Sequence, residues 1–157
     1  MKQMVAIVGL VLVCATGALM TTVGASGAVK AGAACVPGVK KINGVSARTF
    51  CGPAKATVKM NGKTFSYSGG ECSKGAGLFA VNIGTIVLGK LKNKPEYFGV
   101  AAAAKAGVQP RQTVAVVHAG TSRSIIGTVA IKVGLKGGTF SGKVFGSSTV
   151  ISGSFTC

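Results

Sequence analysis

The chain has 157 residues, of which 18 are lysine or arginine and only two are acidic, so its net charge is +16. Its hydrophobic fraction of 48% is too high for a disordered chain. A single histidine, without a CxxC or HxxxH pattern, excludes the common metal sites, and the scarcity of acids leaves little for acid–base catalysis. The sequence therefore predicts one globular domain without a metal site or cofactor.

The first 28 residues have the three parts of a secretory signal peptide. Lys2 supplies a positive start, residues 5–20 form an uncharged apolar run, and small residues follow. Residues 1–28 are therefore predicted to be a cleaved signal peptide. Two alternatives stay open. Residues 5–23 are almost long enough for a membrane anchor, and Cys14 could be lipidated, although valine precedes it where lipidation motifs have a small residue.

The cysteine count supports export. Four cysteines follow the predicted signal, and an even number in an exported chain suggests two disulfides, formed in an oxidising compartment. Four cysteines allow three pairings, and the residues alone leave all three open. We therefore expect a secreted or cell-surface location, with disulfides among Cys35, Cys51, Cys72 and Cys157.

The segment after the signal, residues 29–53, is predicted to precede the main domain, residues 54–157. It contains Pro-Gly at 37–38 and Asn-Gly at 43–44, and both dipeptides are typical of turns. The segment is therefore either a compact disulfide-stapled loop or a short hairpin.

From residue 54 onward the hydrophobic pattern has a period of two, which is typical of strands. Asn61 and Gly62 separate two alternating runs, a strong hairpin signal, and Phe65 and Tyr67 would share one face of the second strand. Further strands rich in valine, isoleucine, threonine and phenylalanine are predicted at residues 78–84, 85–91, 113–119, 124–133, 139–146 and 149–157.

Only residues 95–106 could be helical, since Pro95 suits a first helical turn and Gly107 suits a helix end. The alanines of this segment would also suit a tightly packed strand or a turn. Seven or eight short strands predict an all-β fold, either an antiparallel β-sandwich or a partly open barrel, with at most this one short helix.

His118 is the only histidine, so a serine hydrolase would have to pair it with Glu71 or Glu96. The chain has no G-x-S-x-G nucleophile turn. A glycosidase would need both glutamates as its carboxylate pair, and Glu71 adjoins Cys72 in a turn-like stretch. The sequence therefore predicts a protein that is not an enzyme, and a pocket that joins His118 to a glutamate would argue for the opposite.

Removal of residues 1–28 leaves a net charge of +15. A field of that sign attracts anionic polymers or lipid headgroups, although dispersed lysines also keep an exported domain soluble. Nucleic acid is an unlikely partner because export separates it from the chain and tryptophan is absent. The candidate anion-binding residues are Lys90, Lys92 and Lys94, which share one face of an extended segment, together with Lys40 and Lys41; a solvated strand edge is the alternative.

Three segments together resemble the mycobacterial surface lipoprotein antigen family, and the resemblance covers residues 54–157. They are "ATVKMNGKTFSYSGGEC", "GLFAVNIG" and "GGTFSGKVFGSSTVISGSFTC". The resemblance implies a small β-rich ectodomain at the cell envelope, without established enzymatic activity. It also implies a Cys72–Cys157 disulfide, which leaves Cys35 to pair with Cys51. The lipobox of that family is not matched, because Gly32 stands where leucine is expected before Cys35.

These observations predict an exported, non-catalytic domain of the cell envelope or surface, an antigen- or adhesin-like interaction protein. The alternative is a secreted cationic module that binds anionic polymers or anionic membranes. A hydrolase is the third hypothesis, and it depends on His118 and the two glutamates.

Overall fold

The computed structural model describes residues 35–157, which form ten β-strands and one short 3-10 turn, η1 (Val133–Leu135). The predicted all-β class is confirmed. The predicted signal peptide, with Cys14, lies outside the described residues. Within residues 35–157 no helix has the length and apolar character needed to cross a membrane. The strands are β1 (Gly38–Ile42), β2 (Val45–Phe50), β3 (Ala54–Met60), β4 (Lys63–Gly75), β5 (Leu78–Val87), β6 (Tyr97–Ala103), β7 (Gly107–His118), β8 (Thr121–Ile131), β9 (Gly137–Val144) and β10 (Val150–Thr156).

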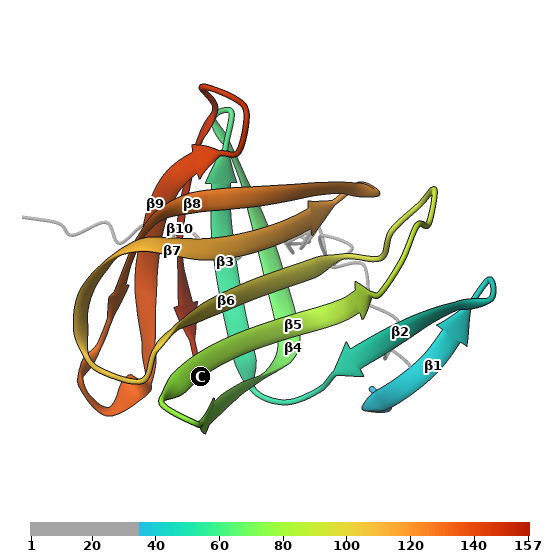
Figure 1. Ribbon diagram of the computed structural model, residues 1–157, viewed down its shortest axis with the longest axis horizontal. Coiled ribbons are helices and arrows are strands. Elements are labelled where there is room, and N and C mark those ends of the chain that lie inside the picture. The colour runs from blue at the N-terminus through green and yellow to red at the C-terminus, as the bar shows by residue number, and fades with distance from the viewer. Residues whose placement is uncertain (1–34) are drawn as a thin grey trace, which may run out of the picture. The chain divides into compact units, whose positions relative to one another are not determined.

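Strands β3 to β10 form a closed antiparallel barrel (Figure 1). Each strand pairs with the next one along the chain, and β10 returns to pair with β3. The sequence left a sandwich and a partly open barrel as alternatives, and the structure is a barrel that is fully closed. Every barrel strand therefore has a neighbouring strand on both sides, although residues Lys63 to Ser68 of β4 pair with β3 alone.

Strands β1 and β2 form a hairpin that extends the sheet from β5 (Figure 1). The first part of β5 lies between β4 and β6, and its last residues, Gly84 to Val87, pair with β2. The Cys35–Cys51 disulfide joins the two ends of the hairpin, with the Cα atoms 5.8 Å apart. The short hairpin that the turn dipeptides allowed is therefore the structure that forms.

Two-residue turns connect four of the hairpins, and both predicted Asn-Gly turns are among them. Asn61 and Gly62 both have positive φ, 51° and 74°, as a type I′ turn requires. Asn43 and Gly44 repeat this geometry between β1 and β2. The type I′ turn has the twist of the flanking strands, so these dipeptides fix the register of each hairpin.

The turn between β4 and β5 has the same geometry with a less suitable residue, since Ala76 has a φ of 48°. The left-handed conformation is unfavourable for alanine and better tolerated by asparagine. We expect Ala76→Asn to raise the free energy of unfolding by about 0.5 to 1 kcal/mol, measured by urea denaturation. Asn61→Ala is the converse change and should lower it by a similar amount. A loss of stability in Ala76→Asn would contradict this account of the turn.

The barrel interior is filled by inward-facing side chains. Phe79, Val81 and Ile83 alternate along β5 onto the inward face, and each of these residues is at most 2% exposed. Phe98 is fully buried near the middle, and its ring centroid lies 5.4 Å from that of Phe140 and 6.5 Å from that of Phe155. The interior is therefore a packed core, and binding surfaces have to be sought on the outside.

One glycine makes room for this core. Gly153 of β10 lies opposite Phe140 of β9, and a Cβ atom on Gly153 would come within 2.7 Å of the Phe140 ring. The ring therefore occupies space that any other residue at position 153 would fill.

The possible helix at residues 95–106 is wrong, because most of this segment is strand β6. Phe98, Val100 and Ala102 are buried and face the interior, while Ala101 is exposed. β6 pairs along its whole length with β5, and its residues Tyr97 to Ala101 pair with β7. Long-range strand pairing therefore outweighs the helix propensity of the alanines.

The prediction of separate strands at residues 78–84 and 85–91 is also wrong. β5 runs without a break through Gly84, which adopts a φ of 89° where the backbone carbonyl of Glu96 approaches it closely. The strand ends at Val87, and residues 88–96 form a connection to β6. The predicted extended lysine strip therefore belongs to this connection.

Candidate binding surface

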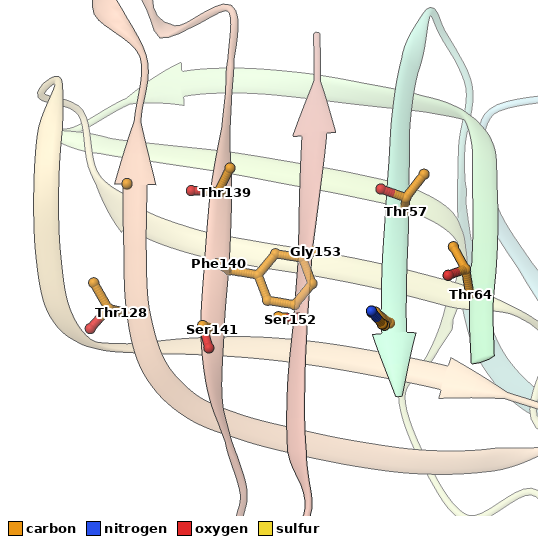
Figure 2. Close-up of a pocket in the computed structure, with 10 residues that line it drawn as sticks. Thr57, Thr64, Thr128, Thr139, Phe140, Ser141, Ser152 and Gly153 are labelled. Atoms are coloured by element: carbon orange, nitrogen blue, oxygen red, sulfur yellow. The ribbon is translucent and has the colours of Figure 1, made fainter. Parts of the chain in front are cut away.

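A groove of about 560 Å³ crosses the outer face of β4, β3, β10, β9 and β8. Strand alternation produces it, because the residues between the buried core positions of these strands point outward and most of them carry hydroxyl groups. Figure 2 shows these side chains on neighbouring strands around Phe140. The lining residues are Thr57, Lys59, Thr64, Thr128, Ala130, Thr139, Phe140, Ser141, Ser152 and Gly153.

The strand register places the polar residues in rows across the groove. Ser152 lies opposite Lys59 on one side and opposite Ser141 on the other. Two residues along, Thr57 lies opposite Ser154, and their hydroxyl oxygens are 2.9 Å apart in a hydrogen bond. Neighbouring hydroxyl groups are about 5 Å apart across strands, so a ligand lying across the strands could contact several of them.

Hydroxyl groups both donate and accept hydrogen bonds, so this groove suits a partner rich in hydroxyl, carbonyl or phosphate oxygens. Lys59 adds a positive charge, and the lining contains no carboxylate and no histidine. The groove therefore offers binding groups without an acid–base pair. We name it the hydroxyl groove.

The structure brings together His118 and Glu96, the pair on which a hydrolase would depend. His118 Nδ1 lies 3.0 Å from Glu96 Oε2, and the backbone N–H of Ala119 donates to Glu96 Oε1 at 2.8 Å. The imidazole also packs against Phe65, with ring centroids 4.0 Å apart. Both carboxylate oxygens therefore hold the β7–β8 turn, and neither side chain lines the hydroxyl groove.

Tyr67 lies near this pair and donates its hydroxyl hydrogen to the carbonyl oxygen of Val117 at 3.3 Å. Burial raises the pKa of Tyr67 to about 12; the Glu96 carboxylate adds to the rise and Arg123 opposes it. Burial also raises the pKa of Tyr97 above its ordinary value. The folded chain therefore favours neutral tyrosine.

The raised pKa values of these tyrosines predict that the folded state loses stability at alkaline pH. An unfolded tyrosine ionises near pH 10, whereas Tyr67 in the folded chain stays neutral up to about pH 12. The unfolded state alone gains from ionisation in this interval, so the free energy of unfolding should fall between about pH 10 and 12. Urea denaturation across this range measures the fall. Tyr67→Phe should show a smaller fall, and an equal fall in both proteins would contradict the assignment.

The second glutamate, Glu71, lies beside the β1–β2 hairpin. Its Oε1 is 4.0 Å from the Arg48 guanidinium, which also stands 5.0 Å above the Phe50 ring. Glu71 therefore faces Arg48, whereas Glu96 faces His118. The two glutamates thus have separate partners and do not form a carboxylate pair. Both acidic side chains of the chain are engaged by its own positive or protonatable groups.

The predicted anion-binding lysines lie in two segments, strand β1 and the connection between β5 and β6. Lys40 and Lys41 are exposed on β1, where strand alternation turns them to opposite faces. The lysine-containing connection starts beside the same hairpin, where Leu88 N–H donates to Ser46 O at 2.8 Å. In the connection, Lys90 and Lys92 belong to irregular structure, and Lys94 forms an isolated antiparallel bridge with Gly120 of the β7–β8 turn. The three lysines therefore do not form one face of a strand.

Sequence reasoning missed the hydroxyl groove and the cations beside it. Lys59 was visible in an alternating strand, and so were Thr57 and Thr64 on the outward positions. The signal that would have found the groove is the coincidence of hydroxyl residues on outward positions of five strands. That coincidence becomes a surface only when the order and register of the strands are known.

The fold and this surface define a class: a small, disulfide-bonded, closed antiparallel barrel with a packed interior and a polar groove on its outer face. Comparison with known protein families, characterised proteins and solved structures finds no match.

Proposed function

We propose that the chain is an exported, non-catalytic domain of the cell envelope or cell surface that acts by binding a partner on the outside of its barrel. The observation that carries the proposal is the pair of disulfides, Cys35–Cys51 and Cys72–Cys157, around a filled core. Disulfides form and persist in oxidising compartments, which supports export. The filled core favours a binding role for the outer surface. Membership of the mycobacterial surface lipoprotein antigen family is part of this proposal.

Expression of the full chain in a bacterial host tests the export. We expect the mature N-terminus, determined by mass spectrometry, to lie within residues 24–30, and we expect all four remaining cysteines to resist alkylation until a reductant is added. The mature protein should be found in the envelope or the medium. A chain that keeps residue 1 and has free thiols in the cytoplasm would overturn the proposal. A lipid on Cys14 would replace cleavage near residue 28 by membrane attachment.

A second function, the binding of anionic polymers or anionic membranes, is favoured by the arrangement of charges. The only two acidic side chains face Arg48 and His118 of the same chain, so the many surface lysines have few acidic partners. Such a surface attracts polyanions, and binding is favoured further because it releases the counterions condensed on the polymer.

Salt dependence tests the second function. The affinity for an acidic polymer should fall steeply as the salt concentration rises, because bound cations release counterions from the polymer. Titration of a soluble polyanion such as heparin at several salt concentrations measures the slope. Binding that is absent, or that does not change with salt, would remove this function.

A further inference from the structure

One end of the barrel carries large apolar side chains in contact with solvent. There the β9–β10 connection and the β3–β4 turn lie side by side (Figure 1). Phe145 in the connection is 76% exposed, Val150 at the start of β10 is 55% exposed, and Ile126 of β8 is 47% exposed. Exposure of a phenylalanine forgoes the favourable free energy of burying its side chain. An exposed apolar patch that contains such a residue is therefore a candidate interaction site.

The strand register shows that these residues form one patch. Lys143 lies opposite Ile126 on β8 and opposite Val150 on β10, and all three are exposed on the outer face. Phe145 follows two residues after Lys143, and its N–H donates to Ser124 O at 2.8 Å, which holds it beside β8. We call Ile126, Lys143, Phe145 and Val150 the barrel-end patch.

Further lysines lie next to the patch on its other side. Lys63 follows the β3–β4 turn and lies opposite the buried Met60, so it is exposed at the mouth of the same barrel end, on the inner side of the sheet. Lys59 lies opposite Ser152, on the outer face that also carries Val150 and Lys143. Both glutamates of the chain are bound elsewhere, to Arg48 and His118, so the patch combines apolar tips with cations alone.

This combination fits the surface of an anionic lipid bilayer. Apolar side chains enter the boundary between headgroups and acyl chains, while lysines remain at the level of the anionic phosphates. A second copy of the chain would bring like charges together, and a soluble polyanion would leave Phe145 in water. We propose that the barrel-end patch docks this domain on anionic lipid bilayers by inserting Phe145. The inference deepens the second proposed function, since it names the membrane and the inserting residue.

A site-specific probe can test the insertion because the chain contains no tryptophan. Phe145→Trp places a fluorophore at the tip of the patch. The matched control is Val133→Trp, at a residue 87% exposed in η1, which lies between β8 and β9 at the opposite end of the barrel. Each protein is mixed with vesicles that contain phosphatidylglycerol and phosphatidylcholine, or phosphatidylcholine alone. Tryptophan emission and co-sedimentation are both measured.

The inference expects a blue shift of Phe145→Trp on vesicles with phosphatidylglycerol and no shift of Val133→Trp. Co-sedimentation without a shift, or an equal shift at both positions, would overturn insertion and leave charge-driven binding in place. Failure to co-sediment at low salt would overturn the inference; if heparin binding is also absent, the second proposed function fails with it.

Two further comparisons use the otherwise unchanged chain. Phe145→Ser should weaken vesicle binding roughly tenfold or more, because the buried apolar area is lost. Lys59→Gln, Lys63→Gln and Lys143→Gln together should weaken it roughly tenfold to a hundredfold. The same three-charge reduction at Lys90, Lys92 and Lys94 should have a clearly smaller effect. Equal losses in the two triple variants would contradict docking through the barrel-end patch.

Discussion

Replacement of both Cys72 and Cys157 by serine is expected to lower the free energy of unfolding by about 4 to 5 kcal/mol. This disulfide closes a loop of 85 residues, and the loss of chain entropy in the unfolded state grows with loop length. It also joins β4 to the residue that follows β10. Because small domains are stable by only about 5 to 15 kcal/mol, the double variant should unfold at much lower urea concentration.

The hairpin disulfide provides the matched control. Replacement of Cys35 and Cys51 by serine opens a loop of only 16 residues, for which the same model gives about 3 kcal/mol. The hairpin lies outside the closed barrel, so its loss should mainly release β1 and β2, visible as faster hydrogen exchange there. A larger loss of global stability from the hairpin disulfide than from Cys72–Cys157 would contradict this interpretation.

Phe98→Ala is expected to cost about 3 to 5 kcal/mol, the range for removing a large aromatic side chain from a packed core. Phe98 is fully buried, and the rings of Tyr67, Phe140 and Phe155 surround it with centroid separations of 6.0, 5.4 and 6.5 Å. Its removal leaves a cavity that three neighbouring rings can only partly fill. Urea denaturation measures the loss.

Phe145→Ala is the control of the same chemistry at an exposed site, and its effect on stability should stay within about 0.5 kcal/mol. If Phe98→Ala does not fold, Phe98→Leu preserves most of the volume and should cost less than Phe98→Ala. Equal effects of Phe98→Ala and Phe145→Ala would mean that the interior is not the packed core described here.

Local signals in the sequence were enough for much of the fold. The period of two predicted the strands around Asn61-Gly62 and the shared face of Phe65 and Tyr67, and these predictions are confirmed. The two Asn-Gly dipeptides predicted the turns correctly because asparagine and glycine tolerate the positive φ that type I′ turns need. The cysteine pairing, in contrast, followed from the family resemblance; the pairing is confirmed, while the family membership stays a prediction.

What the sequence could not predict depends on contacts between distant residues. The alanines of residues 101–104 suit a helix locally, and only pairing with β5 and β7 makes most of them part of a strand. Barrel closure depends on β10 meeting β3, a contact between residues almost 100 positions apart. A sandwich would satisfy the same alternation, so local pattern alone does not distinguish the two folds.

The candidate site was harder to predict than the fold for the same reason. The sequence selected Lys90, Lys92 and Lys94 because their spacing is visible along the chain. The hydroxyl groove and the barrel-end patch are assembled instead across strands, and Ile126, Lys143 and Val150 become neighbours only through register. Sequence also overlooked the polar contact of Gln109, which is buried and bonds Ala103 and Lys105 at the β6–β7 connection.

The pairing of β10 with β3 also determines when this domain can fold. Until residues 150–156 have been made, β3 and β9 have open edges and one wall of the core is missing. Contacts of this sequence separation form slowly, so the barrel cannot be completed on a partly synthesised chain. A chain that leaves the cell unfolded through a translocation pore has to avoid early folding. For the export proposed above, this order of strands keeps the barrel open until residues 150–156 have been made, and the Cys72–Cys157 bond then joins β4 to the residue that follows β10.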